Sequence, residues 1–151
     1  MIGRGGNGAR ALQGALQDLM WERAGVVRDE PGLRTGLERV VELRTSVEDV
    51  EVRGGTVGVA DLARALDLRA GVETAEATLR GAIERAETRG CHNRSDFPDL
   101  DPGLRVNLRV SREPSTGRLA VDPRPVPPIP AELSAWASAE QVVPAGEQLL
   151  E

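Results

Sequence analysis

The chain has 151 residues, the size of one ordinary domain, and a net charge of −5, which gives it no general attraction to nucleic acid. All 19 basic residues are arginine, and the aromatic residues are Trp21, Phe97 and Trp136, so any core must be aliphatic. A single cysteine, Cys91, excludes an internal disulfide, and no apolar run reaches the length of a membrane span or a signal sequence. We therefore expect a cytoplasmic protein without a membrane span.

The first eight residues contain Gly3, Gly5 and Gly8 in the spacing G-x-G-x-x-G. In a dinucleotide site this pattern follows a strand and opens a helix within a βαβ unit. Here only two residues precede it and no βαβ pattern follows. We interpret residues 1–8 as a flexible leader.

Two amphipathic helices are predicted next. The first runs from Ala9 to Arg23, and Gly25 is a typical stop. The second begins after Asp29, a suitable N-cap, has Pro31 in its first turn, and continues to about Val47. Their inward-facing residues are predicted to be Leu12, Leu16, Leu19 and Met20, then Leu33, Leu37, Val40, Val41, Leu43 and Val47.

The longest predicted element is a single helix from Thr56 to Arg89, ended by Gly90. It contains no proline and would be roughly 50 Å long. One side is apolar, with Leu68, Val72, Ala75, Leu79, Ala82, Ile83 and Ala86. An adjoining side pairs opposite charges such as Glu76 and Arg80, and a third side consists of small residues that would let another backbone approach closely. The three helices, connected by short loops, predict an antiparallel bundle over residues 9–98, including an exit loop.

The character of the chain changes after Pro98. Leu104 to Val110 alternates apolar and polar residues, Glu113 to Gly117 is a turn, and Leu119 to Val121 is a short returning strand. A small β-hairpin of this kind must pack on something, because an isolated one is only marginally stable. Pro123 to Pro130 carries five prolines and predicts an extended, Pro-rich arm.

We place the hairpin and the arm together in residues 99–137, packing on the bundle, with a last short helix from Ala131 to Ala137. Residues 138–151 are interpreted as a tail.

The densest polar cluster follows the long helix. Cys91 and His92 do not predict a nucleophile–base pair, since adjacent side chains usually point apart and no third orienting group is evident. They also do not predict zinc, which needs three or four ligands. We expect instead that His92, Arg94 and Asp96 fix the exit loop by hydrogen bonds and charge pairs; the loop could equally clasp a partner surface.

Several stretches of the sequence together resemble one family. They are residues 11–13 and 16–21, 25–28, 75–80 and, most specifically, 87–98, where Arg-Gly-x-His-x-Arg-x-Asp follows a long helix. These stretches resemble the C-terminal helical domain of the succinate dehydrogenase/fumarate reductase flavoprotein subunit, which is shared with L-aspartate oxidase. The resemblance runs from about Gly8 to Pro130.

The resemblance implies a mainly α fold: a spectrin-repeat-like antiparallel three-helix bundle, then a strand-containing extended segment. It implies a larger FAD-dependent oxidoreductase in which an N-terminal Rossmann-like domain and a capping domain hold the flavin and the catalytic residues. We therefore expect no cofactor, no metal and no catalytic residue on this chain. The flavin-binding domain is the expected partner, with an iron–sulfur subunit as a further one. The family motif supplies the expected docking residues Arg89, Gly90, His92, Arg94 and Asp96.

Two functions stay open from the sequence. The chain is expected either to be the inactive C-terminal domain of such an enzyme, with a structural or docking role, or to be a free-standing helical interaction module or truncated gene product without redox function. The sequence does not distinguish succinate dehydrogenase, fumarate reductase and aspartate oxidase, because the residues that bind the dicarboxylate would lie outside it.

Overall fold

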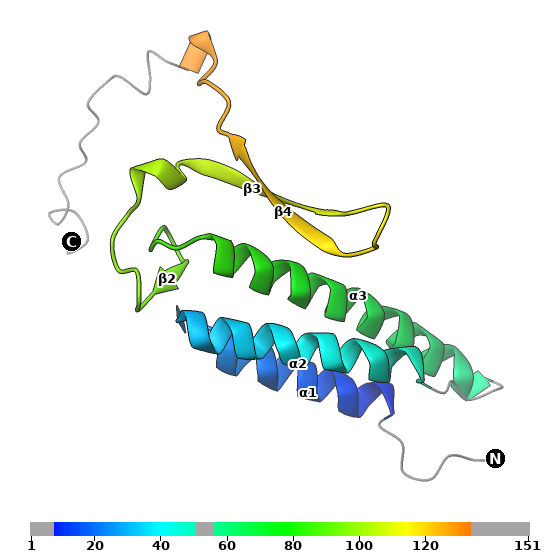
Figure 1. Cartoon of the computed structure of the whole chain (residues 1–151). Helices are drawn as coiled ribbons and strands as arrows, with labels where there is room; N and C mark the ends of the chain where they lie inside the picture. The colour runs from blue at the N-terminus through cyan, green and yellow to red at the C-terminus, as the bar shows by residue number, and fades with distance from the viewer. Residues whose placement is uncertain (1–7, 51–55, 134–151) are drawn as a thin grey trace, which may run out of the picture.

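The computed structural model describes residues 8–50 and 56–133, which form three antiparallel helices and a β-hairpin (Figure 1). The helices are α1 (Ala9–Ala24), α2 (Glu30–Glu48) and α3 (Thr56–Glu84). Strands β3 (Val106–Arg112) and β4 (Leu119–Pro125) form the hairpin, which lies against α3 with α3 between it and the other two helices. The predicted fold class, a mainly α bundle followed by a small hairpin, is confirmed.

The core is aliphatic, as the composition requires, and lies where the three helices meet. Its buried residues are Leu12, Leu16, Ala24, Leu33, Val40, Val47, Leu68, Val72, Ala75, Leu79 and Ala82. Val41 was predicted to face inward, but it is 44% exposed. A step of about 100° around the helix separates Val41 from the buried Val40, and this step carries Val41 out of the stripe that faces the other helices.

The ends of α1 and α2 agree with the local signals in the sequence. α1 ends at Ala24, with Gly25 as its C-cap. The Asp29 side chain accepts a hydrogen bond of 2.7 Å from the Gly32 amide, as an N-cap residue does, and Pro31 lies in the first turn of α2.

The predicted long helix is wrong at its C-terminal end: α3 ends at Glu84 and not at Arg89. The carbonyl oxygens of its last turn are bound by the side chain of Arg94, and the Thr88 amide bonds instead to Asp99 O at 3.1 Å. Gly90 does not cap the helix. It has a φ of +57°, which a glycine adopts without strain, within a turn in which Arg89 and His92 exchange both backbone hydrogen bonds.

A parallel pairing of two short strands was not predicted. Strand β1 (Val27–Arg28), between α1 and α2, pairs with β2 (Asn93–Arg94), after α3. The pairing joins the first helical connection to the exit loop. A 3-10 turn, η1 (Pro102–Leu104), then leads into the hairpin.

The hairpin differs from the prediction in its bounds. β3 lies two residues further along the chain than expected, and β4 extends to Pro125, so Pro123 and Pro125 belong to a strand and not to the arm. The hairpin turn is as predicted, with Glu113 N donating to Arg118 O at 2.8 Å and Gly117 at a φ of +69°. The leader before Gly8, the last helix beyond residue 133 and the tail lie outside the described residues.

Within the described part of the chain, no helix combines the length and the apolar character that crossing a bilayer requires.

Candidate functional site

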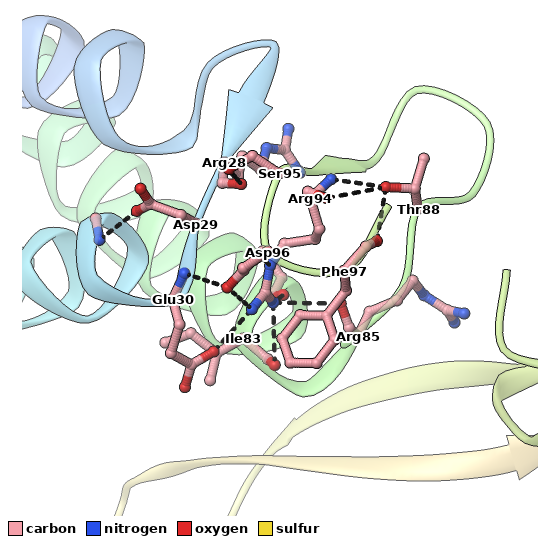
Figure 2. A network of polar contacts seen from close by, with 12 residues as sticks. Arg28, Asp29, Glu30, Ile83, Arg85, Thr88, Arg94, Ser95, Asp96 and Phe97 are labelled. Carbon is pink, nitrogen blue, oxygen red and sulfur yellow. Dashed lines mark hydrogen bonds and ion pairs between the residues drawn. The ribbon is translucent and has the colours of Figure 1, made fainter. Parts of the chain in front are cut away.

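One end of the bundle carries a dense network of charged side chains. Here the C-terminus of α1, the N-terminus of α2 and the C-terminus of α3 meet, and residues 85–101 fold over them (Figures 1 and 2). Helix ends leave backbone N–H and C=O groups without helical partners. At this end side chains from the exit loop and from β1 supply those partners. We call this assembly the end network.

Arg94 is the centre of the end network, and its side chain is fully buried. Its guanidinium donates to Ala82 O at 2.9 Å, at the C-terminus of α3. It also donates to both Asp96 carboxylate oxygens, at 2.8 and 2.9 Å, and to Glu30 Oε2 at 2.9 Å, as Figure 2 shows. A cation at a helix C-terminus is favoured by the helix dipole, and the forked bond to Asp96 is the geometry at which arginine is strongest.

Asp96 joins this centre to α2. Besides binding Arg94, its Oδ2 accepts a bond of 2.8 Å from the backbone amide of Glu30, the first residue of α2. The Arg94 guanidinium holds the pKa of the Asp96 carboxyl well below its usual range, and the Glu30 amide acts in the same direction. One carboxylate therefore bridges the N-terminus of α2 and the arginine at the C-terminus of α3.

Arg28 binds the carbonyl oxygens at the C-terminus of α1. Its Nε donates to Ala24 O and Gly25 O, at 3.1 and 2.9 Å. The backbone oxygen of Arg28 accepts a bond of 2.9 Å from the Ser95 amide, which extends the β1–β2 pairing. Each of the three helix termini is therefore capped by a residue that also contacts another element of the end network.

His92 lies between two of these segments. Its Nδ1 is 2.9 Å from the Arg28 guanidinium, and its Nε2 is 3.0 Å from Arg85 O. Since the guanidinium can only donate and the carbonyl can only accept, the neutral imidazole with its proton on Nε2 satisfies both contacts. Burial lowers the pKa of His92; the bond to Arg85 O opposes this, and the positive charges of Arg28, Arg94 and Arg85 add to the lowering.

The buried carboxylate of Glu87 connects the end network to the hairpin. Glu87 is fully buried and accepts bonds from Arg85 at 2.6 Å, from Arg89 at 2.7 and 2.9 Å, and from the Asp101 amide at 2.9 Å. The bonds from Arg89 lower the pKa of Glu87 to about 2, although burial alone would raise it. Arg85 also donates to Leu104 O and Val106 O, at 3.0 and 2.8 Å, and so fixes the start of β3.

These contacts brace the exit loop against the three helix ends. Both ring nitrogens of His92 are bound within the chain, so His92 is not placed to act as a base for the exposed Cys91. No group of three or more His, Cys, Asp and Glu side chains arranged to hold a metal occurs in residues 8–50 and 56–133.

Exposed apolar side chains surround the buried network. Val26 and Val27, between α1 and α2, are 74% and 59% exposed, and Phe97 and Leu100, in the exit loop, are 41% and 62% exposed. The ring of Phe97 lies under the Arg94 guanidinium, 4.8 Å from it, so Arg94 also fixes the position of Phe97. A shallow cleft between residues 96 and 102 includes Phe97, Asp99 and Leu100 in its lining.

The predicted docking residues fall into two groups. Arg94 is buried, and Asp96 and His92 are bound within the chain, whereas Gly90 is exposed and Arg89 is partly exposed. Prediction from sequence missed the network partners Arg28, Glu30, Arg85 and Thr88. Glu87 carried a signal, because it belongs to the dense polar cluster that follows the long helix, but its partners were not predicted.

Comparisons with known proteins agree on one family. Residues 13–128 match the family model described as Fumarate reductase flavoprotein C-term. The chain is 28% identical over 142 residues to the fumarate reductase flavoprotein subunit of Mycobacterium tuberculosis, covering 93% of this chain and 23% of that protein. It is 32% identical over 95 residues to an uncharacterized FAD-dependent oxidoreductase of Methanocaldococcus jannaschii, covering 63% of this chain and 17% of that protein.

Solved structures give the same result. The chain superimposes on Mycobacterium smegmatis Sdh1 with a TM-score of 0.74 and 26% identity, over 88% of this chain and 23% of Sdh1. It thus spans about a fifth of the length of the relatives it matches, between 17% and 23% in these three comparisons.

Proposed function

The chain belongs to the family Fumarate reductase flavoprotein C-term, and from this membership we propose that it docks, as a non-catalytic C-terminal helical domain, onto the flavin-binding part of an FAD-dependent oxidoreductase. The reaction class is that of succinate dehydrogenase and fumarate reductase. The docking surface is the bundle end that carries the end network. Arg89 and Gly90 lie on this surface, and His92, Arg94 and Asp96 hold it in shape through bonds within the chain.

The observation that carries this proposal is the contrast between the inside and the outside of the bundle end. Inside, Arg94 and Glu87 are fully buried and bonded on every side, so the loop over the helix ends is held in one shape. Outside, Phe97 and Leu100 expose apolar surface that the loop holds in place. Exposed apolar groups on a rigid, charged support are typical of protein–protein contact sites, where they become the buried centre of the interface.

FAD is proposed to be held by the flavin-binding part and not by this chain. A flavin dinucleotide site places its pyrophosphate at the N-terminus of a helix that follows a parallel strand. In residues 8–50 and 56–133 the helix that follows a parallel strand is α2, after β1. Its first amide already binds the Asp96 carboxylate, and the Asp29 carboxylate occupies the Gly32 amide. An anionic cofactor would have to displace both carboxylates. An iron–sulfur subunit is a further proposed partner.

The test is co-expression of this chain with the flavin-binding polypeptide of the same organism, followed by affinity purification and a flavin absorbance spectrum. We expect the two polypeptides to co-purify with flavin, and this chain alone to purify without it. Leu100→Asp is expected to reduce complex formation, because it places a charge in the apolar contact. Leu66→Asp is the matched control, since Leu66 is 56% exposed on α3, away from the end network. Complex formation unchanged by Leu100→Asp would refute this docking surface.

A second candidate function is the free-standing interaction module. It is favoured by an apolar row on the N-terminal half of α3, where Val59, Leu62 and Leu66 are 71%, 49% and 56% exposed. The same pair of variants separates the two functions. A module that binds through this row would lose its partner with Leu66→Asp and keep it with Leu100→Asp.

A further inference from the structure

The hairpin has two strands, and its two outer edges differ chemically. β3 and β4 are antiparallel, with Val106 opposite Pro125, Leu108 opposite Pro123 and Val110 opposite Val121. In such a ladder, hydrogen-bonded pairs alternate with pairs whose N–H and C=O groups point outward, away from the partner strand. Which residues point outward decides what each edge can bind.

The alternation can be assigned from the turn. Glu113 N donates to Arg118 O, so Glu113 and Arg118 form a hydrogen-bonded pair, and every second pair from there is bonded in the same way. Leu108 and Val110 on β3, and Val121 and Pro123 on β4, therefore point their backbone groups outward. The structure agrees at the start of β3, where the outward Val106 O accepts the bond from Arg85.

Proline blocks one edge and leaves the other open. On β4 the outward positions include Pro123 and Pro125, which have no N–H to donate, and this is a common way to protect an edge strand from further pairing. On β3 the outward positions Leu108 and Val110 keep both donor and acceptor. No bond to either of these amides from outside the hairpin is found within residues 8–50 and 56–133. The open edge is thus a stretch of β3 running from Leu108 to Arg112.

We propose that this open edge of β3 receives an extended, acidic segment of the flavin-binding part as a third strand. The proposal rests on the docking function above and adds a second, backbone-mediated contact to it. An added strand satisfies the free backbone groups of the edge and extends a sheet that has only two strands of its own. Arg85 lies at the beginning of this edge and joins it to the end network, so the two contacts are continuous.

The charges along β3 indicate which kind of segment can bind its open edge. The stretch from Leu104 to Arg112 contains three arginines and no acidic residue. Arg112 pairs with Glu73 of α3, and Arg109 shares the Asp122 carboxylate with Arg124, so the hairpin keeps an excess of positive charge. Arg109 lies on the exposed face of the hairpin, and Arg105 is exposed just before β3. A second copy of β3 would bring its own arginines next to these, and like charges on neighbouring strands repel. A segment that alternates apolar residues with aspartate or glutamate fits both faces of the hairpin. Its apolar side chains would pack toward α3, and its carboxylates would pair with the arginines on the exposed face.

The test compares proline substitutions at one cross-strand pair. Val110→Pro removes an outward N–H from the edge of β3, and Val121→Pro removes the equivalent outward N–H from the edge of β4. Both residues are half-buried valines that face α3, and neither variant removes a hydrogen bond of the hairpin itself. Each is co-expressed with the flavin-binding polypeptide, and the dissociation constant of the complex is measured. We expect Val110→Pro to weaken the complex by about 10-fold and Val121→Pro to leave it unchanged.

Hydrogen exchange on the unmutated chain gives a second measurement that does not depend on the variants folding. The Leu108 and Val110 amides are expected to exchange fast in the free chain and about 100-fold or more slowly in the complex. A complex that forms without slowing these amides would overturn the edge proposal and leave the docking function intact. Failure of the unmutated chain to bind the flavin-binding polypeptide would overturn both. A dimer of this chain that Val110→Pro dissociates would overturn the acidic-segment proposal in favour of a second copy.

Discussion

Arg94→Ala tests whether the end network is what holds the three helix ends together. The substitution removes the cation that binds Asp96 and Glu30 and leaves Ala82 O at the end of α3 without its bond. Deleting one partner of a buried ion pair typically costs about 3–5 kcal/mol. We expect the lower end of this range, because the Asp96 and Glu30 side chains are 27% and 33% exposed and water can solvate the carboxylates that remain. For a domain of this size, each kcal/mol lowers the melting temperature by about 2–4 °C, so we expect a loss on the order of 10 °C.

The assay is thermal and urea unfolding at pH 7, with a conservative variant and a surface control. Arg94→Lys is expected to recover only part of the loss, since an ammonium group cannot make the forked bond to Asp96 while also reaching Glu30 and Ala82 O. Arg109→Ala is the control. Arg109 also pairs with a carboxylate, that of Asp122 at 3.1 Å, but the two side chains are 56% and 44% exposed. An exposed pair of this kind contributes about 1 kcal/mol or less.

The result that would refute the reasoning is a melting temperature for Arg94→Ala equal to that of Arg109→Ala. In that case Arg94 would not brace the bundle end, and its place in the docking motif would have to come from direct contact with the partner.

Three further predictions concern protonation and packing. Glu87 has a pKa of about 2 in the folded chain, below its value of 4.5 when unfolded. The stability that its ionised form provides is therefore present above pH 4.5 and is lost as the pH falls toward 2. Glu87→Gln should remove this loss, so that the free energy of unfolding changes less with pH in this range. His92 should titrate by NMR below pH 6.5 with its proton on Nε2 when neutral, and Arg28→Ala should raise that pKa by removing a nearby positive charge. Gly81→Ala should raise the free energy of unfolding by about 0.5–1 kcal/mol, because a Cβ at this position meets nothing within 4 Å. Gly36→Ala should lower the free energy of unfolding, because the added Cβ would lie 3.0 Å from Arg23 Cβ and 3.1 Å from a Leu79 methyl group.

Local signals predicted the bundle well where local residues decide the structure. Gly25 and the pair Asp29 and Pro31 mark the ends of α1 and α2 in the sequence, and the structure uses them as caps. The end of α3 could not be found in this way. Residues 85–89 are compatible with a helix, and what ends it is a bond from Arg94 to Ala82 O, made by a side chain 12 residues further along the chain.

The candidate site was predictable only in part for the same reason. The spacing of His92, Arg94 and Asp96 indicated a loop fixed by charge pairs, but their partners Arg28 and Glu30 lie 64 residues earlier in the chain. Their pairing depends on the arrangement of the three helices, which no local pattern encodes. The buried Glu76 is a similar case. It lies in a charged stripe of α3, yet it is buried, because Arg44 of α2 and Arg80 together neutralise it.

The bond between Asp96 and the Glu30 amide has a consequence for the order of events during synthesis. The two residues are 66 positions apart, so α2 leaves the ribosome long before the carboxylate that binds its first amide. At about 5–20 residues per second the delay is on the order of 3–13 s. Throughout that interval the first amide of α2 has no carboxylate partner from the exit loop, although the local caps from Arg28 and Asp29 are already present. A chain stalled after α3 but before Asp96 therefore contains all three helices and their core residues, but it lacks the carboxylate that binds the first amide of α2.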